Sequence, residues 1–318
     1  MRYLFTALGV LFLLAAIYMA TAYFCFRKAA RRGREANIDK FLAAKQFDGY
    51  REELSAAIAY VRLLPYEDVY ITSFDGLRLH AKVFRAENER AAVLLFHGYR
   101  SDYGYFDFGA VIRKYLEKGI SLLLVDQRSH GKSEGKYIGF GSHESRDAMQ
   151  WLKFMTDTFG SDIQIILHGV SMGCATVMMM SGNPDLPKNV KFTVADCGYT
   201  SPWAEFDYQL KNAHVPTSPL LDGANFFNKH IAKYDFKKVD AVESVSHAQV
   251  PMLFIHGTKD DFVPTYMVHE LYDACSTDKD LLLVEGAGHA ESYPTDSAAY
   301  EAKVKSFIDK YIAVESKA

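Results

Sequence analysis

Six short runs of continuously apolar residues recur between positions 92 and 284, and each ends at a polar or glycine-bearing loop. Most of the intervals between them are long enough for a helix, as at 142–158 and 296–313. Buried strands that alternate with helices form a parallel sheet with helices on both faces, joined by right-handed crossovers. The pattern therefore predicts an α/β fold with a mostly parallel central sheet. The predicted strands are 92–96, 121–125, 163–167, 191–195, 251–255 and 281–284.

The pattern changes twice ahead of these runs. Apolar residues at helix-like spacing in 35–66, from Phe41 to Val61, predict an amphipathic helical connector that packs on the body. Two β-rich runs follow in 69–84 and flank Asp75-Gly76, a pair favoured in tight hairpin turns. We therefore expect a connector helix and a β-hairpin before the parallel strands.

One interval is too long for a single crossover helix. About fifty residues separate Asp196 from Val250, and they are rich in aromatic side chains and interrupted by prolines. An insertion of this length above the strand ends is typical of a cap over a binding site. We expect a helical cap at about 199–247, with most of its aromatic residues packed into the cap's own core.

The first segment is apolar enough to cross a membrane. Residues 3–26 contain no charged side chain over 24 positions. As a helix they would extend about 36 Å, against a hydrocarbon core of about 30 Å. A cleaved signal peptide is the alternative, because Ala20-Thr21-Ala22 mimics its cleavage site, but the apolar run continues to Phe26. We therefore predict a retained, single-pass transmembrane helix in the cell membrane.

Basic residues cluster directly after this helix, whereas only Arg2 and the amino terminus precede it. The positive-inside rule then places the body in the cytoplasm, with an extracytoplasmic body as the alternative. The same cluster is suited to contact with anionic lipid. We expect an anchor with its basic flank at 1–34, the connector at 35–66 and the main domain at 67–318. The basic residues are Arg27, Lys28, Arg31, Arg32 and Arg34.

Composition narrows the class of protein further. The chain has 318 residues, of which 49% are hydrophobic, enough for the core of one long α/β domain. The first 34 residues carry six of the 36 basic residues and none of the 39 acidic ones, so the remainder has a formal charge of −9. A body of this charge lacks the basic footprint of nucleic-acid binding. The four cysteines show no paired metal-binding spacing, so neither a metal site nor a disulfide framework is expected.

One serine is placed where a predicted strand meets a helix. Residues 169–173, Gly-Val-Ser-Met-Gly, follow an apolar run and precede a helix-compatible one. In this context GxSxG forms a nucleophile elbow. Gly169 and Gly173 leave room for a very tight turn that strains and exposes the serine. Ser171 is therefore the candidate nucleophile, and the Met172 N–H at the helix N-terminus is a candidate oxyanion donor.

A nucleophilic serine requires a base, and the base requires an orienting acid. Asp260 lies in "HGTKDDFVP" after one predicted strand, and His289 lies in "EGAGHAES" after the next. The order serine, aspartate, histidine, each in a loop after its own strand, predicts that the three side chains converge at one edge of the sheet. Asp261 and Asp196 are the alternative acids, since Asp196 also ends a predicted strand.

Four separated motifs carry a resemblance to a known superfamily. With these motifs in order, residues 67–313 resemble the α/β-hydrolase superfamily, in particular its lysophospholipase-like, monoacylglycerol-lipase-like and serine-aminopeptidase-like members, including membrane-anchored bacterial ones. The resemblance implies an α/β-hydrolase fold with a cap insertion. The motifs are HGYRS at 97–101, DQRSHGKSEG at 126–135, GVSMG at 169–173, and the pair GTKDDFVP at 257–264 and GAGH at 286–289.

The resemblance implies roles for the three candidate residues. Ser171 would be the nucleophile, and His289 the general base and then the general acid. Asp260 would orient His289, because the pattern GxxDxxVP places the functional carboxylate at 260 and not at 261. This assignment favours Asp260 over both alternative acids.

The resemblance also implies an oxyanion loop. The residue after the glycine of the HG motif supplies the second amide, which is Tyr99 here, with His97 and Gly98 in support. Asp126 and Arg128 match a stretch that is expected to fix a loop. Two further strand-end histidines, His168 and His256, resemble His97 in position, and we expect local hydrogen bonds to hold all three without a direct catalytic role.

These expectations define an activity. Ser171 would attack an acyl carbon, two backbone amides would hold the oxyanion, and water would release the acyl-enzyme without a metal or other cofactor. The sequence assigns no oligomeric state and no acyl length. We predict a membrane-anchored serine hydrolase that cleaves carboxylic esters of small acyl compounds or lipids. An amidase, a peptidase or an acyltransferase on the same triad, and a noncatalytic ligand-binding module, are the alternatives.

Overall fold

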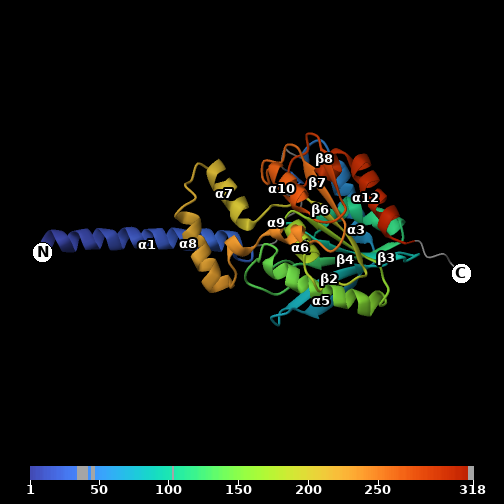
Figure 1. Cartoon of the computed structure of the whole chain (residues 1–318), viewed down its shortest axis with the longest axis horizontal. Coiled ribbons are helices and arrows are strands. Elements are labelled where there is room, and N and C mark those ends of the chain that lie inside the picture. Colours follow the sequence, from blue (N-terminus) through green and yellow to red (C-terminus); the bar gives the residue numbers. More distant parts are fainter. Residues whose placement is uncertain (34–41, 44–46, 102–103, 314–318) are drawn as a thin grey trace.

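Eight strands form one sheet in the computed structural model, which describes residues 1–33, 42–43, 47–101 and 104–313. The strand order is β1-β2-β4-β3-β5-β6-β7-β8 (Figure 1). β2 is antiparallel to β1 and β4, and all other neighbours are parallel, so the sheet is mostly parallel as predicted. The strands are β1 (Glu67–Thr72), β2 (Arg78–Phe84), β3 (Ala91–Phe96), β4 (Ile120–Asp126), β5 (Ile165–Val170), β6 (Val190–Asp196), β7 (Met252–Gly257) and β8 (Lys279–Val284).

The strand bounds differ from the prediction where polar residues are buried. β5 runs to Val170, three residues beyond the predicted end, because His168 and Gly169 continue its pairing with β3 and β6. The predicted helix at 296–313 is preceded by a separate short helix, α11 (Ser292–Thr295). Asp296 ends α11 and caps α12 (Ser297–Tyr311), since its carboxylate accepts a 2.9 Å hydrogen bond from the Ala299 N–H.

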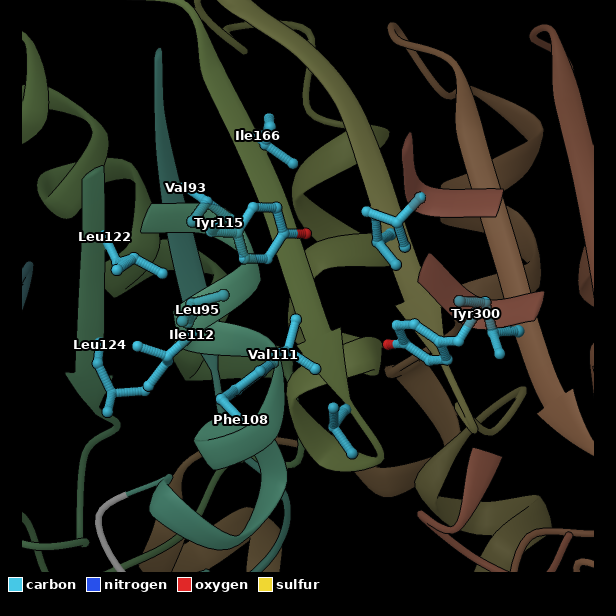
Figure 2. Packing of buried hydrophobic residues seen from close by; sticks show 14 of the residues in the cluster. Val93, Leu95, Phe108, Val111, Ile112, Tyr115, Leu122, Leu124, Ile166 and Tyr300 are labelled. Atoms are coloured by element: carbon cyan, nitrogen blue, oxygen red, sulfur yellow. The ribbon is translucent and has the colours of Figure 1, made fainter. Parts of the chain in front are cut away.

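Helices cover both faces of the sheet. Adjacent strand residues point to opposite faces, so Leu95 packs with α3, α4 and α12, while Leu94 packs with α5 and α6. Figure 2 shows the first layer, in which Phe108, Ile112 and neighbouring side chains of α4 lie on β3, β4 and β5. The covering helices are α3 (Arg51–Leu63), α4 (Tyr105–Glu117), α5 (Ser142–Phe159), α6 (Met172–Ser181), α9 (Ala241–Ser246), α10 (Tyr266–Ala274) and α12.

The connector region contributes to this core. Its helix α3 buries Leu54, Ile58 and Val61 against the body. A Cβ on Gly109 of α4 would lie 3.0 Å from the Ile58 side chain, so the missing side chain lets the two helices approach closely. Residues 34–41 and 44–46, with the predicted apolar position Phe41, lie outside the described residues.

The segment between β6 and β7 forms helices above the sheet edge. Its aromatic residues pack together with Ile138 and Phe140 from the β4–α5 loop, so the cap core is shared with the body. The last helix of the segment, α9, packs against α6 and α10 of the body. The elements are α7 (Pro202–Asn212), α8 (Leu220–Phe227), a π-helical turn at Asn228–Ala232, a 3₁₀ turn at Phe236–Lys238, and α9.

The N-terminal helix α1 (Arg2–Ala30) projects from the body (Figure 1). Within the described residues it is the one helix long and apolar enough to span a membrane. Its last turns pack on α8, where a Cβ on Gly223 would lie 2.7 Å from the Ala22 Cβ. The Tyr18 hydroxyl donates a 2.9 Å hydrogen bond to the Pro219 carbonyl. Small residues thus let the membrane-type helix and the cap approach closely.

Candidate active site

Ser171 lies in the sharp turn between β5 and α6. Its φ of +54° is in the left-handed region, which is strained for a serine. A Cβ on Gly169 would lie 2.1 Å from the Gly173 carbonyl oxygen, and a Cβ on Gly173 would lie 1.8 Å from the Phe96 carbonyl oxygen. Both glycines are therefore required by close backbone contacts, as the elbow pattern predicts.

Ser171, His289 and Asp260 form one hydrogen-bonded chain. The Nε2 of His289 lies 2.9 Å from the Ser171 Oγ, and its Nδ1 lies 2.8 Å from the Asp260 Oδ2. With the proton on Nδ1, the ring donates to the carboxylate and Nε2 accepts from the serine hydroxyl. This arrangement has the geometry of a nucleophile, a base and an orienting acid.

Backbone contacts between two loops explain why Asp260 and His289 meet. The Lys259 N–H donates to the Ala287 carbonyl at 2.9 Å, and the Gly286 N–H donates to the Thr258 Oγ1 at 2.9 Å. A Cβ on Gly257 would lie 2.3 Å from the Ala287 carbonyl oxygen. The loops after β7 and β8 are therefore held together in a register that only a residue without a side chain permits at 257.

The environment of Asp260 favours its charged form. Its Oδ1 accepts hydrogen bonds from the N–H groups of Phe262 and Val263 at 3.0 and 2.8 Å. Burial opposes ionisation, but hydrogen bonds from His256 and His289 lower the pKa of Asp260 to about 2. Burial also disfavours a charged His289, yet its hydrogen bond to Asp260 and the charge of that carboxylate raise the pKa of His289 above its usual value.

Neither alternative acid is hydrogen-bonded to His289. Asp261 is exposed, and Asp196 accepts a 3.1 Å hydrogen bond from the Tyr300 hydroxyl. That hydroxyl also lies 3.0 Å from His168, which in turn bonds to Tyr115. Burial raises the pKa of Asp196 to about 7, despite the hydrogen bond from Tyr300. In the structure His289 is therefore bonded to Asp260, while Asp196 belongs to a separate buried network.

Two backbone amides next to Ser171 have no acceptor among the described residues, those of Tyr99 and Met172. Around Tyr99, in contrast, the Gly98 N–H donates to Asp107 and the Arg100 N–H donates to His130. A Cβ on Gly98 would lie 3.5 Å from the Ser171 Cβ. One unpaired amide thus lies in the loop that contacts Ser171 and the other on the residue after it, and both are free to donate to a ligand.

All three strand-end histidines are hydrogen-bonded, His97 and His256 to nearby backbone as expected, whereas His168 bonds to side chains far along the chain. The Nδ1 of His97 lies 2.8 Å from the Gly98 carbonyl, and its Nε2 accepts from the Gln127 N–H at 3.1 Å. His168 is bonded to two tyrosine hydroxyls, and burial lowers its pKa to about 3. The Nε2 of His256 lies 2.8 Å from the Val263 carbonyl and 3.3 Å from Asp260, so His256 supports the acid.

A small apolar pocket opens beside Ser171. Its volume is about 80 Å³, below the roughly 300–1,000 Å³ of sites for drug-sized ligands. The rings of Phe140 and Phe206 meet edge to face with centroids 5.1 Å apart, and Phe262 lies 4.9 Å from the His289 ring. The lining residues of the pocket are Tyr99, Phe140, Ser171, Met172, Tyr199, Pro202, Glu205, Phe206, Gln209 and Phe262.

One buried carboxyl group interrupts this apolar wall. The Oε1 of Glu205 on α7 accepts a 2.9 Å hydrogen bond from Gln209, and its Oε2 has no partner among the described residues. Burial raises the pKa of Glu205 to about 7, against the lowering effects of Gln209 and His289. Near neutral pH this group can therefore donate or accept a hydrogen bond within the pocket.

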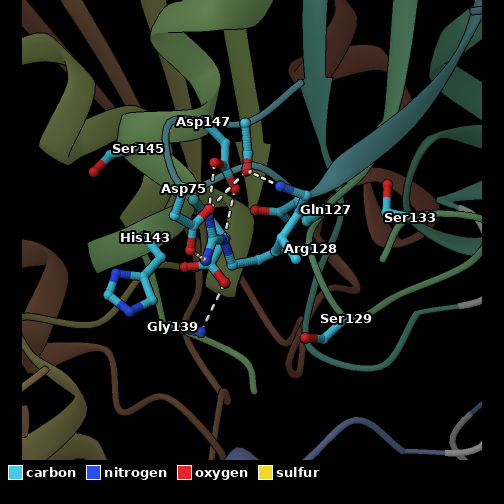
Figure 3. A network of polar contacts seen from close by, with 12 residues as sticks. Asp75, Gln127, Arg128, Ser129, Ser133, Gly139, His143, Ser145 and Asp147 are labelled. Atoms are coloured by element: carbon cyan, nitrogen blue, oxygen red, sulfur yellow. Dashed lines mark hydrogen bonds and ion pairs between the residues drawn. The ribbon is translucent and has the colours of Figure 1, made fainter. Parts of the chain in front are cut away.

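A buried ion-pair network supports the loop after β4 (Figure 3). Arg128 donates to both carboxylate oxygens of Asp147 on α5, at 2.6 and 2.7 Å, and to Asp75 in the hairpin turn, at 3.1 and 2.9 Å. Asp126 accepts from the Lys132 N–H at 2.9 Å and bonds to His80 at 2.6 Å. The stretch from Asp126 to Ser133 thus fixes a loop, as predicted, and does not reach Ser171.

One group of potential metal ligands overlaps the triad. Cys197, Asp260 and His289 bring ligand atoms within 4.8 Å of one another. Burial raises the pKa of the Cys197 thiol well above its usual value, which disfavours the thiolate that binds metals. Because Asp260 and His289 already bond to each other, these atoms fit a hydrogen-bonded triad better than a metal site.

Phe140 and Glu205 are among the pocket residues that lie outside the sequence motifs. Phe140 has a φ of +51°. The loop that carries Phe140 is held by Glu144, whose carboxylate accepts hydrogen bonds from the N–H groups of Gly139 and Gly141 at 2.7 and 3.0 Å. The glycines around Phe140 are a local sign of an unusual turn. Glu205 carries no such sign, because its burial depends on how the cap packs.

Comparison with known proteins gives the context of this geometry. A model of the prolyl oligopeptidase family matches residues 116–315. "Uncharacterized protein YqkD" of Bacillus subtilis is 31% identical over 200 residues, which cover 61% of this chain and 64% of that protein, less than two thirds of its length. "Uncharacterized membrane protein YNL320W" of Saccharomyces cerevisiae is 24% identical over 67% of this chain and 69% of its own length.

A solved structure is similar across most of the chain. The esterase Pf2001 of Pyrococcus furiosus matches with a TM-score of 0.64 and 23% identity, over 82% of this chain and 95% of its own. At this identity the likeness concerns the fold. The α/β-hydrolase fold expected from the four sequence motifs is confirmed.

Proposed function

The chain belongs to the prolyl oligopeptidase family of the α/β-hydrolase superfamily, and we propose that it is a membrane-anchored serine hydrolase that cleaves carboxylic esters. Ser171 is the nucleophile, His289 the base and Asp260 the orienting acid. The observation that carries this proposal is the hydrogen-bonded chain of these three side chains, with contacts of 2.9 and 2.8 Å, beside two unpaired amides.

The reaction follows from this geometry. His289 Nε2 takes the proton as the Ser171 Oγ attacks the acyl carbon, and Asp260 stabilises the imidazolium that forms. The amides of Tyr99 and Met172 donate to the oxyanion, each contributing about 3 kcal/mol to the lowering of the barrier. His289 then protonates the leaving alcohol, and water releases the acyl group by the same route.

The size of the pocket favours substrates with a short acyl group. A volume of about 80 Å³ with apolar walls leaves little room for a long chain unless the cap moves. The similar Pyrococcus furiosus structure is called an esterase, in agreement with this class. The family description favours one second candidate, cleavage of a peptide or other amide bond by the same residues.

The membrane anchor is the apolar helix α1. Its apolar residues up to Ile17 are exposed, whereas Ala22 and Phe26 are buried against the cap and the β4–α5 loop. An exposed apolar helix end requires a nonpolar environment, which a bilayer provides. The basic residues after Phe26 favour a cytoplasmic body. A reporter fused to the C-terminus should give a cytoplasmic signal, and an external signal would reverse this orientation.

A fluorophosphonate probe tests the nucleophile directly. The full chain in detergent should be labelled at Ser171, the S171A variant should not be labelled, and S145A, which removes a serine of α5 outside the site, should react like the wild type. Nitrophenyl esters from acetate to laurate and an aminoacyl amide then separate the substrate classes. We expect short esters to react fastest, and a chain that is folded but unlabelled would contradict the proposal.

A further inference from the structure

A second cavity lies where the end of α1 meets the β4–α5 loop. It has a volume of about 540 Å³ and is lined by residues of 23–33 and 135–137. Four cationic side chains face it, those of Arg27, Arg31, Arg32 and Lys136, and none of its described lining residues is acidic. A cavity of this size and charge is suited to an anionic ligand.

The cavity is built by contacts between its two walls. Arg31 pairs with Tyr137 through an isolated antiparallel β-bridge, and the Ile138 N–H donates to the Ala30 carbonyl at 2.7 Å. The Arg32 guanidinium donates to the carbonyls of Gly131 and Ser133, so its position is fixed. The cations therefore belong to a fixed wall of the protein and not to a free helix end.

Three of the four cations are available to a ligand. Arg27, Arg31 and Lys136 are exposed, and none of them forms an ion pair with a carboxylate in the described part of the chain. Guanidinium groups bind phosphate oxygens in pairs, and an ammonium group adds a point charge. This chemistry matches a phosphate group better than a single carboxylate.

The depth of the cavity identifies the source of the phosphate. Exposed apolar side chains continue along α1 as far as Phe24, one turn before Arg27, so the cations lie at the level of lipid headgroups when α1 spans a bilayer. Tyr23 and Tyr137 also line the cavity, and tyrosines are enriched at this level. We propose that this cavity binds the phosphate of an anionic phospholipid headgroup. The proposal rests on the membrane anchoring proposed above.

Native mass spectrometry of the full chain in detergent micelles tests the site. Micelles with equal amounts of phosphatidylglycerol and phosphatidylcholine should leave phosphatidylglycerol bound, and the variant R31Q/K136Q should lose this preference at least tenfold. The control variant K28Q/K233Q removes two exposed cations that do not line the cavity, and should keep it. Equal binding of both lipids, or an equal loss in the control variant, would overturn the proposal.

Inorganic phosphate distinguishes the two sources of the anion. Displacement of phosphatidylglycerol by millimolar phosphate would assign the cavity to a free anion and overturn the lipid proposal, whereas no displacement supports it. Flotation of the same variants with membranes after alkaline extraction reports anchoring, and fluorophosphonate labelling of Ser171 reports the hydrolase site. Failure of either is thus distinguishable from failure of lipid binding.

Discussion

The hydroxyl of Tyr99 donates a 2.7 Å hydrogen bond to the carbonyl of Ala29, 70 residues earlier in the chain. Ala29 lies in the last turn of α1, and the backbone of Tyr99 supplies one of the two unpaired amides beside Ser171. The Tyr99 ring is also stacked on Phe140 in the pocket wall, with centroids 5.4 Å apart. The proposed anchor therefore supports the proposed oxyanion loop directly.

Replacement of Tyr99 by phenylalanine tests this support. Y99F removes the hydroxyl and leaves the ring in the pocket, so we expect kcat for a short ester to fall about 2- to 10-fold while KM changes little. The control is Y137F, because Tyr137 contacts α1 through its backbone and its ring, and this change keeps both. An unchanged kcat in Y99F would show that α1 and the oxyanion loop act independently.

Replacement of Asp260 by asparagine tests the orienting acid. D260N should lower kcat/KM about 10⁴-fold, because the imidazole loses both its tautomer and its stabilising charge. In the wild type the raised pKa of His289 places the rising limb of the pH profile above 6.5, since the protonated ring cannot accept the serine proton. In D260N the hydrogen bond and charge that most raise the pKa of His289 are lost while burial still lowers it, so the limb should move to lower pH.

The exposed neighbour Asp261 provides the control for this experiment. D261N should keep both the rate and the position of the rising limb, because its carboxylate faces solvent. A loss of activity in D261N as large as that in D260N would mean that the acid has been assigned to the wrong residue.

Replacement of Gly173 by alanine tests the elbow. The added Cβ would lie 1.8 Å from the Phe96 carbonyl oxygen, so G173A must displace β3 or α6. We expect destabilisation at the upper end of the roughly 1–3 kcal/mol typical of overpacking, together with loss of probe labelling. G49A has open space around its Cβ and should leave thermal unfolding unchanged. A stable, active G173A would contradict the close packing of the turn.

The sheet and the three candidate side chains were predictable because they depend on local sequence. Ser171, Asp260 and His289 each follow a buried strand, and parallel strands bring their following loops to one edge. The pocket was not predictable in this way. Glu205 and Phe206 lie on a cap helix, whose position depends on long-range contacts such as that between Phe206 and Phe140. The contact of α1 with the cap and with Tyr99 has the same origin.

The buried carboxyl group of Glu205 should make stability depend on pH. Its pKa is raised from 4.5 to about 7, so in the folded state it keeps its proton over a range in which the unfolded chain has lost it. The contribution of this protonated carboxyl group to the free energy of unfolding is therefore complete below pH 4.5 and is lost as pH rises towards 7. The pKa shift corresponds to a loss of about 3 kcal/mol in the free energy of unfolding by pH 8.

Replacement of Glu205 by glutamine isolates this effect from other buried acids such as Asp196. E205Q keeps a polar group of the same shape but cannot ionise, so denaturant unfolding should show it more stable than the wild type at pH 8 and nearly equal at pH 5. D235N, at a carboxylate whose pKa is lowered from 3.8, should be less stable than the wild type by the same amount at pH 5 and pH 8, since its stabilising charge is complete above pH 3.8. A difference between E205Q and the wild type that does not change with pH would mean that Glu205 stays charged in the pocket, held there by a cation or by water.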